Sequence, residues 1–404
     1  MEFRLTTEQE LFRKTVREFC ESKVAPRSRE IDDSDANLPD DLLQEMADLG
    51  IFGVTIPEQY GGSAMPGEEL VYANFVVQEV ARAELSMSLP VYTLLCLGWS
   101  YLVAQRGSEQ LKREVLPKVA SGQWFLGICT TEASGGSDVA AIKTTAKKVG
   151  DKYVINGDKV YVSGCKEAAK RGGGHLTLFR TAPELGIRGM AFAYVPVNAP
   201  GFSYNVLRDM GRGGLSTSTI SYKDVEIPEY YILGEDRRGF HMNMEGFNAA
   251  RILVSAACVG GADRALDMSS EYVKQRHLFG LPMAKFQGVS FEIADDRAKL
   301  EMLKLYLMRT AWMVDQFYGD PTSFSRKEIN EAVAVCKLTA PHLALDIVKH
   351  SMMYHGAFAF TKDCPLEMAL RGLMSYVVGA EGGANIMRII IGREFIGDVS
   401  VGYK

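Results

Sequence analysis

A single acidic residue, Glu381, stands in a run of small residues near the end of the chain, Gly379-Ala380-Glu381-Gly382-Gly383. Apolar segments with helical spacing flank this run on both sides. Such surroundings disfavour an ionised carboxylate and bring its pKa nearer the working pH, as a general base requires. The same residue could instead be an acid that stabilises the N-terminus of the following helix. The residue types alone leave both interpretations open.

A second stretch with chemical potential is the loop Cys129–Asp138, which combines hydroxyl groups, glycines and one glutamate directly after the apolar run Trp124–Ile128. Exposed backbone N–H groups and hydroxyls can hold a polar ring system or a phosphate. A tight surface turn has a similar composition. The rest of the chain must therefore decide whether this loop binds a ligand.

The third candidate is Arg251, which follows Asn248 by three residues in a long apolar helical segment. It could form an ordinary ion pair on a helix face. Alternatively, a buried guanidinium there could order Glu381 or bind a carboxylate on a substrate.

Length and composition limit what these residues can belong to. With 404 residues, 47% of them hydrophobic and 24% charged, the chain is long enough for about two or three globular domains. A net charge of −5 without a basic patch indicates no nucleic-acid partner. The seven scattered cysteines form neither a C-x-x-C pair nor a cluster with histidines, which predicts free thiols and no metal site. Met1–Thr6 lacks the apolar region of a signal peptide, so we expect a cytoplasmic protein.

One segment, Ser86–Gln105, has twenty residues without a charge and is in principle long enough to cross a membrane. It contains Pro90, Gly98 and several hydroxyls, and charges of both signs lie close to each end. These features favour a buried helix pair and predict no membrane span.

The periodicity of apolar residues divides the chain into three parts. The first part predicts helices from Thr7, where Glu10 completes a capping box, and over 39–50, 68–83 and 108–120. The second predicts strands over 152–155 and 159–162, joined by a hairpin turn at Asn156-Gly157, and over 176–180, 190–197 and 217–222. The third predicts helices over about 240–276, 289–317, 327–355 and 366–396.

This order predicts an α+β fold class. We expect an N-terminal helical domain over 1–121, a middle antiparallel β-barrel or sandwich domain over 122–238, and a C-terminal four-helix-bundle domain over 239–404.

Together with this order, nine short motifs make almost the whole chain resemble the acyl-CoA dehydrogenase family. In chain order they are Gly50–Pro57 continuing to Tyr60-Gly61-Gly62, Thr131-Glu132-x-x-Gly135-Gly136-Ser137-Asp138, Asn156-Gly157-x-Lys159, Asp224-Val225-x-Ile227-Pro228, Gly234-Glu235, Asn248-x-x-Arg251, Arg276-x-x-Phe279-Gly280, Phe286-Gln287 and Glu381-Gly382. Each motif is weak alone, but their common order is specific.

The resemblance implies an FAD enzyme that oxidises an acyl-CoA thioester to the 2-enoyl-CoA and passes electrons to an electron-transfer flavoprotein. Glu381 matches the catalytic base. The positions implied to bind the cofactor are Ile128, Thr130, Thr131, Ser137, Tyr161, Ser163, Arg276, Phe279, Phe286, Gln287 and Gly383. Those implied to contact the substrate are Ser137, Asn248, Arg251 and Gly382. Arg276, Phe279 and Gln287 match positions that reach the FAD of a neighbouring subunit, which implies a homo-oligomer, a dimer of dimers.

Several positions depart from the family pattern. Ala380-Glu381-Gly382-Gly383 replaces Tyr-Glu-Gly-Thr, and Met353–Ala359 replaces Gln-x-x-Gly-Gly-x-Gly, which puts contacts to the adenosine side of FAD in doubt. The spacing from Arg371 to Glu381 is one residue longer, and Lys166–Gly174 resembles a longer, more basic loop. These departures predict a specialised branch for branched, aromatic or dicarboxylic acyl-CoAs.

The narrowest hypothesis is an (R)-benzylsuccinyl-CoA dehydrogenase of anaerobic toluene degradation. Alternatives are a short- or branched-chain acyl-CoA dehydrogenase, an acyl-CoA oxidase or flavin monooxygenase on the same fold, and a non-catalytic acyl-CoA-binding protein.

Overall fold

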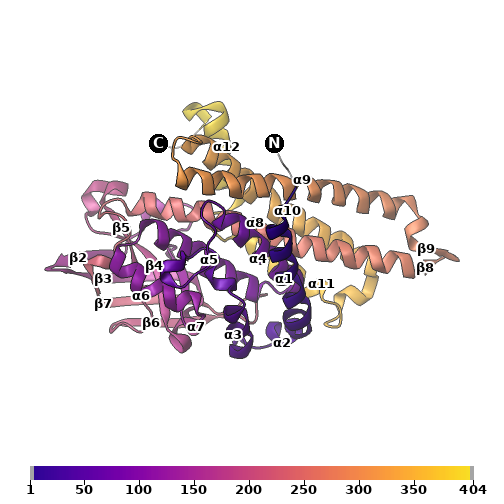
Figure 1. Cartoon of the computed structure of the whole chain (residues 1–404), viewed down its shortest axis with the longest axis horizontal. Helices are drawn as coiled ribbons and strands as arrows, with labels where there is room; N and C mark the ends of the chain where they lie inside the picture. The colour runs from indigo at the N-terminus through magenta and orange to yellow at the C-terminus, as the bar shows by residue number, and fades with distance from the viewer. Residues whose placement is uncertain (1–3, 401–404) are drawn as a thin grey trace.

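The computed structural model describes residues 4–400, so the outermost ends of the predicted first and third domains, and Met1–Phe3 of the N-terminal segment, lie outside the described residues. Figure 1 shows helices from both ends of the chain packed beside a β-rich middle part. The predicted α+β class, with helices, then a β domain, then helices, is confirmed.

The first part of the chain is helical as predicted. Its helices are α1 (Thr7–Phe19), α2 (Ser28–Asp32), α3 (Asp40–Asp48), α4 (Glu69–Ala83), α5 (Ser88–Arg106) and α6 (Glu109–Ala120). The capping box predicted at Thr7 and Glu10 is wrong by one residue. The Gln9 backbone N–H donates to Thr6 Oγ1 at 3.2 Å, and the Thr6 N–H donates to Gln9 Oε1 at 3.1 Å. Thr6 is the N-cap residue because its backbone is extended, whereas Thr7 is already helical.

The uncharged segment around residues 86–105 forms one buried helix, α5, and not the predicted pair. Pro90 lies in its first turn, where the missing N–H breaks no helical hydrogen bond. Gly98 lies where α5 packs closely on α8 (Gly239–Gln275), since a Cβ at this position would be 3.6 Å from Ala250 Cα. Within residues 4–400 no helix is long and apolar enough to cross a membrane.

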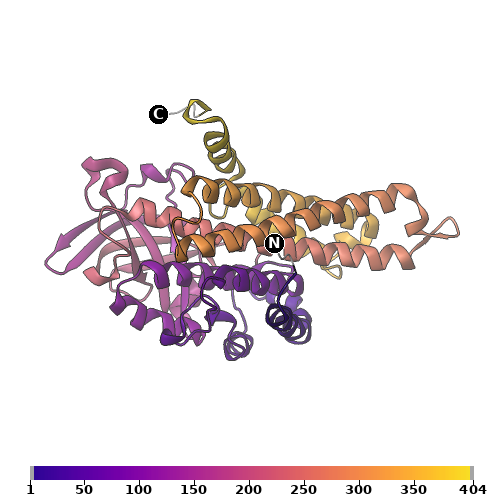
Figure 2. The ribbon, with the colours of Figure 1, turned by 45° about the horizontal axis from the view of Figure 1, so that its top comes forward.

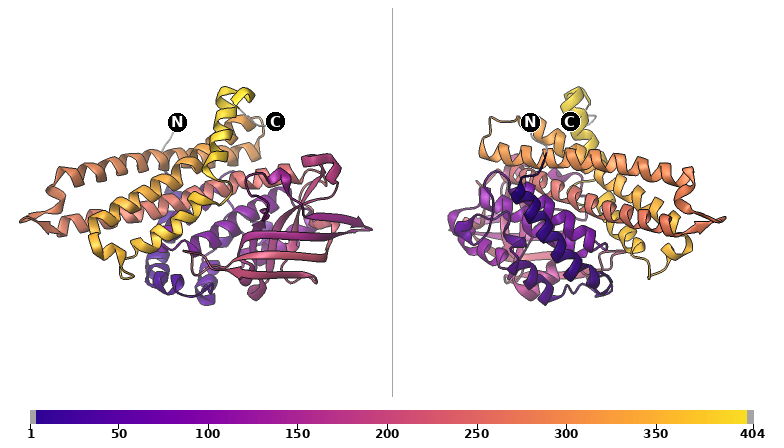
Figure 3. Two further views of the ribbon diagram at one scale, coloured as in Figure 1. Left: turned by 180° about the vertical axis from the view of Figure 1, so that it is seen from behind. Right: turned by 45° about the vertical axis from the view of Figure 1, so that its right-hand side comes forward.

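The middle part is a seven-stranded sheet (Figure 3, left). Its strands are β1 (Phe125–Cys129), β2 (Thr145–Val149), β3 (Lys152–Ser163), β4 (Gly173–Arg180), β5 (Met190–Pro196), β6 (Phe202–Leu207) and β7 (Thr217–Pro228). They follow the order β1-β4-β2-β3-β7-β6, with β5 on β4. Most pairs are antiparallel, but β1 and β2 pair with β4 in parallel, which makes the sheet mixed. Of these strands, β1, β2 and β6 were not among those predicted.

The hairpin predicted at Asn156-Gly157 is wrong. Strand β3 runs straight through these residues, and its register against β7 shifts there, as in a β-bulge. A Cβ at Gly157 would lie 2.7 Å from Thr144 Cα, so glycine is required by close packing and not by a turn. Asn156 instead joins β3 to the Asp224 backbone and side chain by two hydrogen bonds. The two-residue turn Gly150-Asp151 connects β2 to β3.

The segment predicted as a longer, basic loop, Lys166–Gly174, is mainly a short helix, α7 (Cys165–Arg171). Its cations contact the N-terminal helices: Lys170 Nζ and Arg171 Nη1 each lie 2.6 Å from a carboxylate oxygen of Asp40. These contacts connect α7 to α3.

The last part contains α8, α9 (Gln287–Gly319), α10 (Arg326–His355), α11 (Leu366–Val378) and α12 (Ala384–Ile396). Helices α8 to α11 pack on one another, and α8 also contacts α4, α5 and β5, so it joins the bundle to the other two parts. The single helix predicted over 366–396 is broken, because Ala380, Glu381 and Gly382 adopt positive φ angles of 55°, 51° and 105°. After this break α12 packs on α10, and Figure 2 shows its C-terminal end projecting from the bundle.

Candidate active site

A cavity of about 1180 Å³ lies between the sheet, α5, α8, α10 and the α11–α12 connection. It brings the loop Cys129–Asp138 together with Glu381, although more than 240 residues of chain separate them. The predicted site residues that line it are Ile128, Thr130, Thr131, Ser137, Tyr161, Ser163, Asn248, Arg251, Glu381, Gly382 and Gly383. The two stretches singled out first therefore form walls of one site.

Four other predicted residues, Arg276, Phe279, Phe286 and Gln287, do not line this cavity. They lie at the turn between α8 and α9, next to the short strands β8 (His277–Leu278) and β9 (Leu281–Pro282), at the far end of the molecule from the sheet (Figure 1). Phe279 is 96% exposed. Their role in binding the FAD of a neighbouring subunit stays a prediction.

A buried ion pair fixes the loop that starts at Cys129. Lys159 Nζ lies 3.0 Å from both the Thr130 carbonyl oxygen and Glu132 Oε1, and donates to each. Glu132 also accepts hydrogen bonds from the backbone of Lys143 and Thr144. Burial opposes ionisation of Glu132, but Lys159 and Thr144 outweigh it and hold the pKa of this carboxyl below its usual value. Glu132 is thus an ionised anchor of the loop, not a base.

Glu381 occupies a strained backbone position. Ala380 and Glu381 are consecutive non-glycine residues in the left-handed region, a conformation that costs on the order of 1–3 kcal/mol per residue and concentrates at functional sites. Burial raises the pKa of Glu381 above its usual value, while Lys337, Arg251 and Arg212 act in the opposite direction. A carboxylate poised between these influences suits proton abstraction near neutral pH.

Arg251 contacts the protein around Glu381. Its Nε donates to the Glu381 carbonyl oxygen at 2.9 Å, Nη1 reaches Asn248 Oδ1 at 3.4 Å, and the guanidinium lies 5.4 Å from the centre of the Phe247 ring. The residue is only 5% exposed, and burial lowers its pKa to about 10, so it is still a cation at neutral pH. Of the two roles considered for a buried Arg251, these contacts support ordering of the loop that carries Glu381.

Lys337, on α10, was missed by sequence analysis. It is 2% exposed, and its Nζ donates to the carbonyl oxygens of Tyr376 at 3.0 Å and Gly379 at 3.4 Å. A lysine there donates to carbonyls at the C-terminal end of α11 that lack a partner within the helix, and its positive charge is stabilised by the negative end of the helix dipole. The available signal was a cation at a core-facing position between Val333 and Ala340.

The comparisons with known proteins agree with this geometry. Three protein-family models match the chain in succession: the acyl-CoA dehydrogenase N-terminal domain over residues 6–123, the middle domain over 127–225 and the C-terminal domain over 237–396. Acryloyl-CoA reductase (NADH) from Anaerotignum propionicum is 31% identical over 398 residues, which cover 98% of this chain and 96% of that protein. The chain belongs to the acyl-CoA dehydrogenase family.

Other members of the acyl-CoA dehydrogenase family match this chain over nearly its whole length. An acyl-CoA dehydrogenase from Bacillus subtilis (strain 168) is 30% identical over 394 residues, covering 97% of this chain and 99% of the relative. The solved glutaryl-coenzyme A dehydrogenase–glutaryl-CoA complex has a TM-score of 0.90 and 28% identity, covering 100% of this chain and 99% of that one. As a member of this family the chain is an FAD-dependent oxidoreductase.

The wall of the cavity opposite Glu381 fits a flavin. Tyr161 lies where the register of β3 shifts between Lys159 and Val162, and its backbone has a positive φ of 61° there. Its side chain is 69% exposed in the cavity lining, so its ring offers a surface on which a planar ligand could pack. Thr131 and Ser163 add hydroxyl groups to the same lining. At Gly135 and Gly383 a Cβ would meet nothing within 4 Å, so there is open space for a ligand beside the backbone. These residues could hold FAD between the sheet and the catalytic loop.

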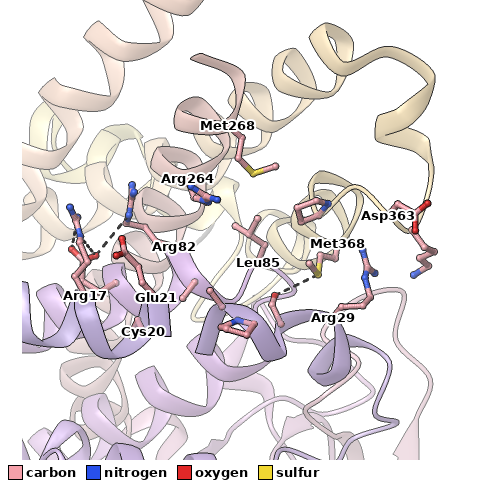
Figure 4. Close-up of a pocket in the computed structure, with 17 residues that line it drawn as sticks. Arg17, Cys20, Glu21, Arg29, Arg82, Leu85, Arg264, Met268, Asp363 and Met368 are labelled. Atoms are coloured by element: carbon pink, nitrogen blue, oxygen red, sulfur yellow. Dashed lines mark hydrogen bonds and ion pairs between the residues drawn. The ribbon is translucent and has the colours of Figure 1, made fainter. Parts of the chain in front are cut away.

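A second cavity, of about 660 Å³, lies between the N-terminal helices, α8 and the segment before α11 (Figure 4). None of the predicted site residues lines it. Several of its arginines already form ion pairs, Arg17 with Glu79 at 2.8 Å and Arg29 with Glu367 at 2.6 Å. This cavity is therefore distinct from the one that holds Glu381.

Proposed function

We propose that this family member oxidises the α,β carbon–carbon bond of a branched, aromatic or dicarboxylic acyl-CoA, with Glu381 as the base. The observation that carries the proposal is the position of Glu381 in one cavity with the loop Cys129–Asp138, its backbone held by Arg251. The narrowest substrate is (R)-benzylsuccinyl-CoA, which adds a phenyl ring and a free carboxylate to the thioester.

The chemistry needs a proton taken from the α-carbon and a hydride from the β-carbon. FAD, when bound, supplies the hydride acceptor. Glu381 takes the α-proton, and its raised pKa makes the carboxylate a stronger base than an exposed glutamate. Arg251 holds the carbonyl of Glu381 and Lys337 holds that of Gly379 just before it, and these contacts keep the carboxylate aligned for proton transfer.

The shape and charge of the cavity support an unusual acyl group. Ala380 lines it where the family pattern has a tyrosine, and this smaller side chain leaves room for a branch or ring. Val91, Leu94 and Leu95 from α5 add an apolar wall, while Arg212 and Arg251 add positive charge. A hydrocarbon branch together with a carboxylate complements such a lining.

We further propose that electron-transfer flavoprotein reoxidises the enzyme and that four copies form a dimer of dimers. Phe395, Ile396 and Val399 are largely exposed close together in the sequence at the end of α12, and such a group of apolar side chains supports contacts with other copies. Sedimentation of the FAD-loaded protein would test this state; a monomer would contradict it.

The functional test is anaerobic titration of the FAD-loaded protein with a set of acyl-CoAs, with flavin absorbance as the readout. We expect bleaching, with the highest rate for benzylsuccinyl-CoA among benzylsuccinyl-, glutaryl-, isobutyryl- and butyryl-CoA. Absence of bleaching by benzylsuccinyl-CoA would refute the narrow substrate, and absence of bleaching by the whole set would refute dehydrogenation.

A second candidate function is reduction of a 2-enoyl-CoA, because one relative with 31% identity is an acryloyl-CoA reductase (NADH). It predicts that NADH reduces the flavin and that a 2-enoyl-CoA reoxidises it. Failure of NADH to bleach the flavin, with reduction by the acyl-CoA intact, would exclude this direction.

A further inference from the structure

Arg212 lies in the loop between β6 and β7 and lines the cavity that holds Glu381. Its side chain is 16% exposed, and its backbone has a positive φ of 60°, unusual for a residue other than glycine. Nη2 donates to Asp209 Oδ2 at 3.1 Å and to Thr217 Oγ1 at 3.0 Å. Within residues 4–400 its Nε and Nη1 have no hydrogen-bond acceptor, so the guanidinium is oriented and still has donors for a ligand.

Arg371 is a second cation of the cavity lining, and it differs from Arg212 in that its donors are used by the protein. Arg371 also lines the cavity, but its Nε donates to Glu367, Nη1 to Asp32 and the Met210 carbonyl, and Nη2 to Asp32. All three of its nitrogens are thus occupied by the protein. Arg371 fixes the loop that carries Arg212, and Arg212 is left to face the ligand.

The hydroxyl of Tyr376, on α11, is the second observation. Tyr376 lines the same cavity and is 1% exposed, yet its hydroxyl has no hydrogen-bond partner within the described part of the chain. Burial raises the pKa of Tyr376 well above its usual value, and Arg212 and Glu381 are among the groups whose charges act on it. A buried hydroxyl without a partner costs on the order of 1–3 kcal/mol, so a ligand acceptor would stabilise it.

We propose that Arg212 and Tyr376 together bind a carboxylate carried by the acyl group, which makes dicarboxylic acyl-CoAs the substrate class. This inference rests on the proposed function of the same cavity. A guanidinium with two free nitrogens can hold a carboxylate at two points, and the phenol adds a third donor.

The charges around the base fit one additional negative group. The three charged groups that act on Glu381, namely Lys337, Arg251 and Arg212, are all cations. Proton abstraction creates negative charge at the thioester, and an uncompensated substrate carboxylate nearby would oppose it. Arg212 therefore permits a charged substrate to react where a neutral cavity would reject it.

The experiment compares each free acid with its own methyl ester in the FAD-loaded protein: glutaryl-CoA and benzylsuccinyl-CoA against their monomethyl esters. The measured quantity is the ratio of kcat/KM for acid over ester. We expect the wild type to prefer the acid, and Arg212→Gln to lower this ratio about 10- to 100-fold, mainly through KM, as expected for loss of a hydrogen bond to a charged group. Arg212→Lys should recover part of the ratio.

Arg208→Gln, in the same loop but exposed and outside the cavity lining, is the matched control and should keep the wild-type ratio. Tyr376→Phe removes one oxygen atom, so it gives the same comparison if Arg212→Gln fails to fold or to retain FAD; we expect a roughly 3- to 10-fold lower ratio. If Arg212→Gln has the same acid-to-ester ratio of kcat/KM as the wild type, the inference is overturned, while dehydrogenation stays intact. The same holds for Tyr376→Phe where that variant replaces Arg212→Gln. A wild type that no acyl-CoA reduces would instead overturn the proposed function itself.

Discussion

Replacing Lys337 with methionine is expected to shift the pH dependence of flavin reduction. The substitution removes the donor to the carbonyls of Tyr376 and Gly379, and each unsatisfied buried carbonyl costs about 1–3 kcal/mol. Part of this cost is offset because a buried ammonium is replaced by an apolar chain of similar length. We therefore expect a net loss of about 1–3 kcal/mol in the free energy of unfolding.

The direction of the change in the rate of flavin reduction follows from the pKa of Glu381. Among the cations that lower the pKa of Glu381, Lys337 acts most strongly, so its removal raises that pKa further. The base acts when ionised, and the ascending limb of the pH profile of the single-turnover rate should move to higher pH in Lys337→Met. At neutral pH, where fewer molecules are ionised and the loop is less well aligned, we expect a rate about 10-fold or more below the wild type.

Two variants make this result interpretable. Lys337→Arg keeps the charge and should keep the ascending limb near its wild-type position, although packing changes. Lys327→Met alters an exposed lysine in the first turn of the same helix and should leave both rate and profile unchanged. A folded, FAD-containing Lys337→Met protein with the wild-type pH profile would refute the reasoning.

Further predictions concern other parts of the site. Arg251→Gln should lower the single-turnover rate by roughly 100-fold with little change in FAD content, since it frees the Glu381 carbonyl; an unchanged rate would count against an ordering role. Lys159→Met leaves the Glu132 carboxylate buried without its cation and should cost about 3–5 kcal/mol in urea unfolding, whereas a loss under about 1 kcal/mol would contradict the anchoring role. Because the pKa of Glu132 is lowered in the folded state, its stabilising contribution is present above its unfolded pKa and lost as pH falls through its folded pKa; the wild type should lose more stability on acidification than Glu132→Gln, and parallel stability curves would argue otherwise.

Much of the fold followed from local patterns. The change from helical to alternating apolar spacing and back predicted the order of the three parts, because each period reflects a face buried against a core. The exceptions arose where one pattern is compatible with two structures. Asn156-Gly157 suits a hairpin or a bulge, and only the packing of Thr144 against Gly157 selects the bulge.

Short motifs mark Glu381 and the loop after Cys129, and the structure places both in the lining of one cavity. Lys337 and Arg212 were missed because their roles depend on distant partners. The carbonyls that Lys337 contacts belong to Tyr376 and Gly379 on another element, and nothing local marks that contact. The break between α11 and α12 did have a local signal, because Gly379, Gly382 and Gly383 lower the helix propensity there; the left-handed backbone of Glu381 had none.

The most direct test of the central claim is the reaction of Glu381→Gln with an acyl-CoA that reduces the wild-type flavin. The FAD-loaded variant is mixed anaerobically with the acyl-CoA, and flavin absorbance is followed in time. We expect the variant to bind the acyl-CoA, seen as a shift of the flavin spectrum, but to bleach about 100- to 10,000-fold more slowly than the wild type, the range that a positioned base contributes. Bleaching at a rate close to that of the wild type would contradict the assignment of Glu381 as the base.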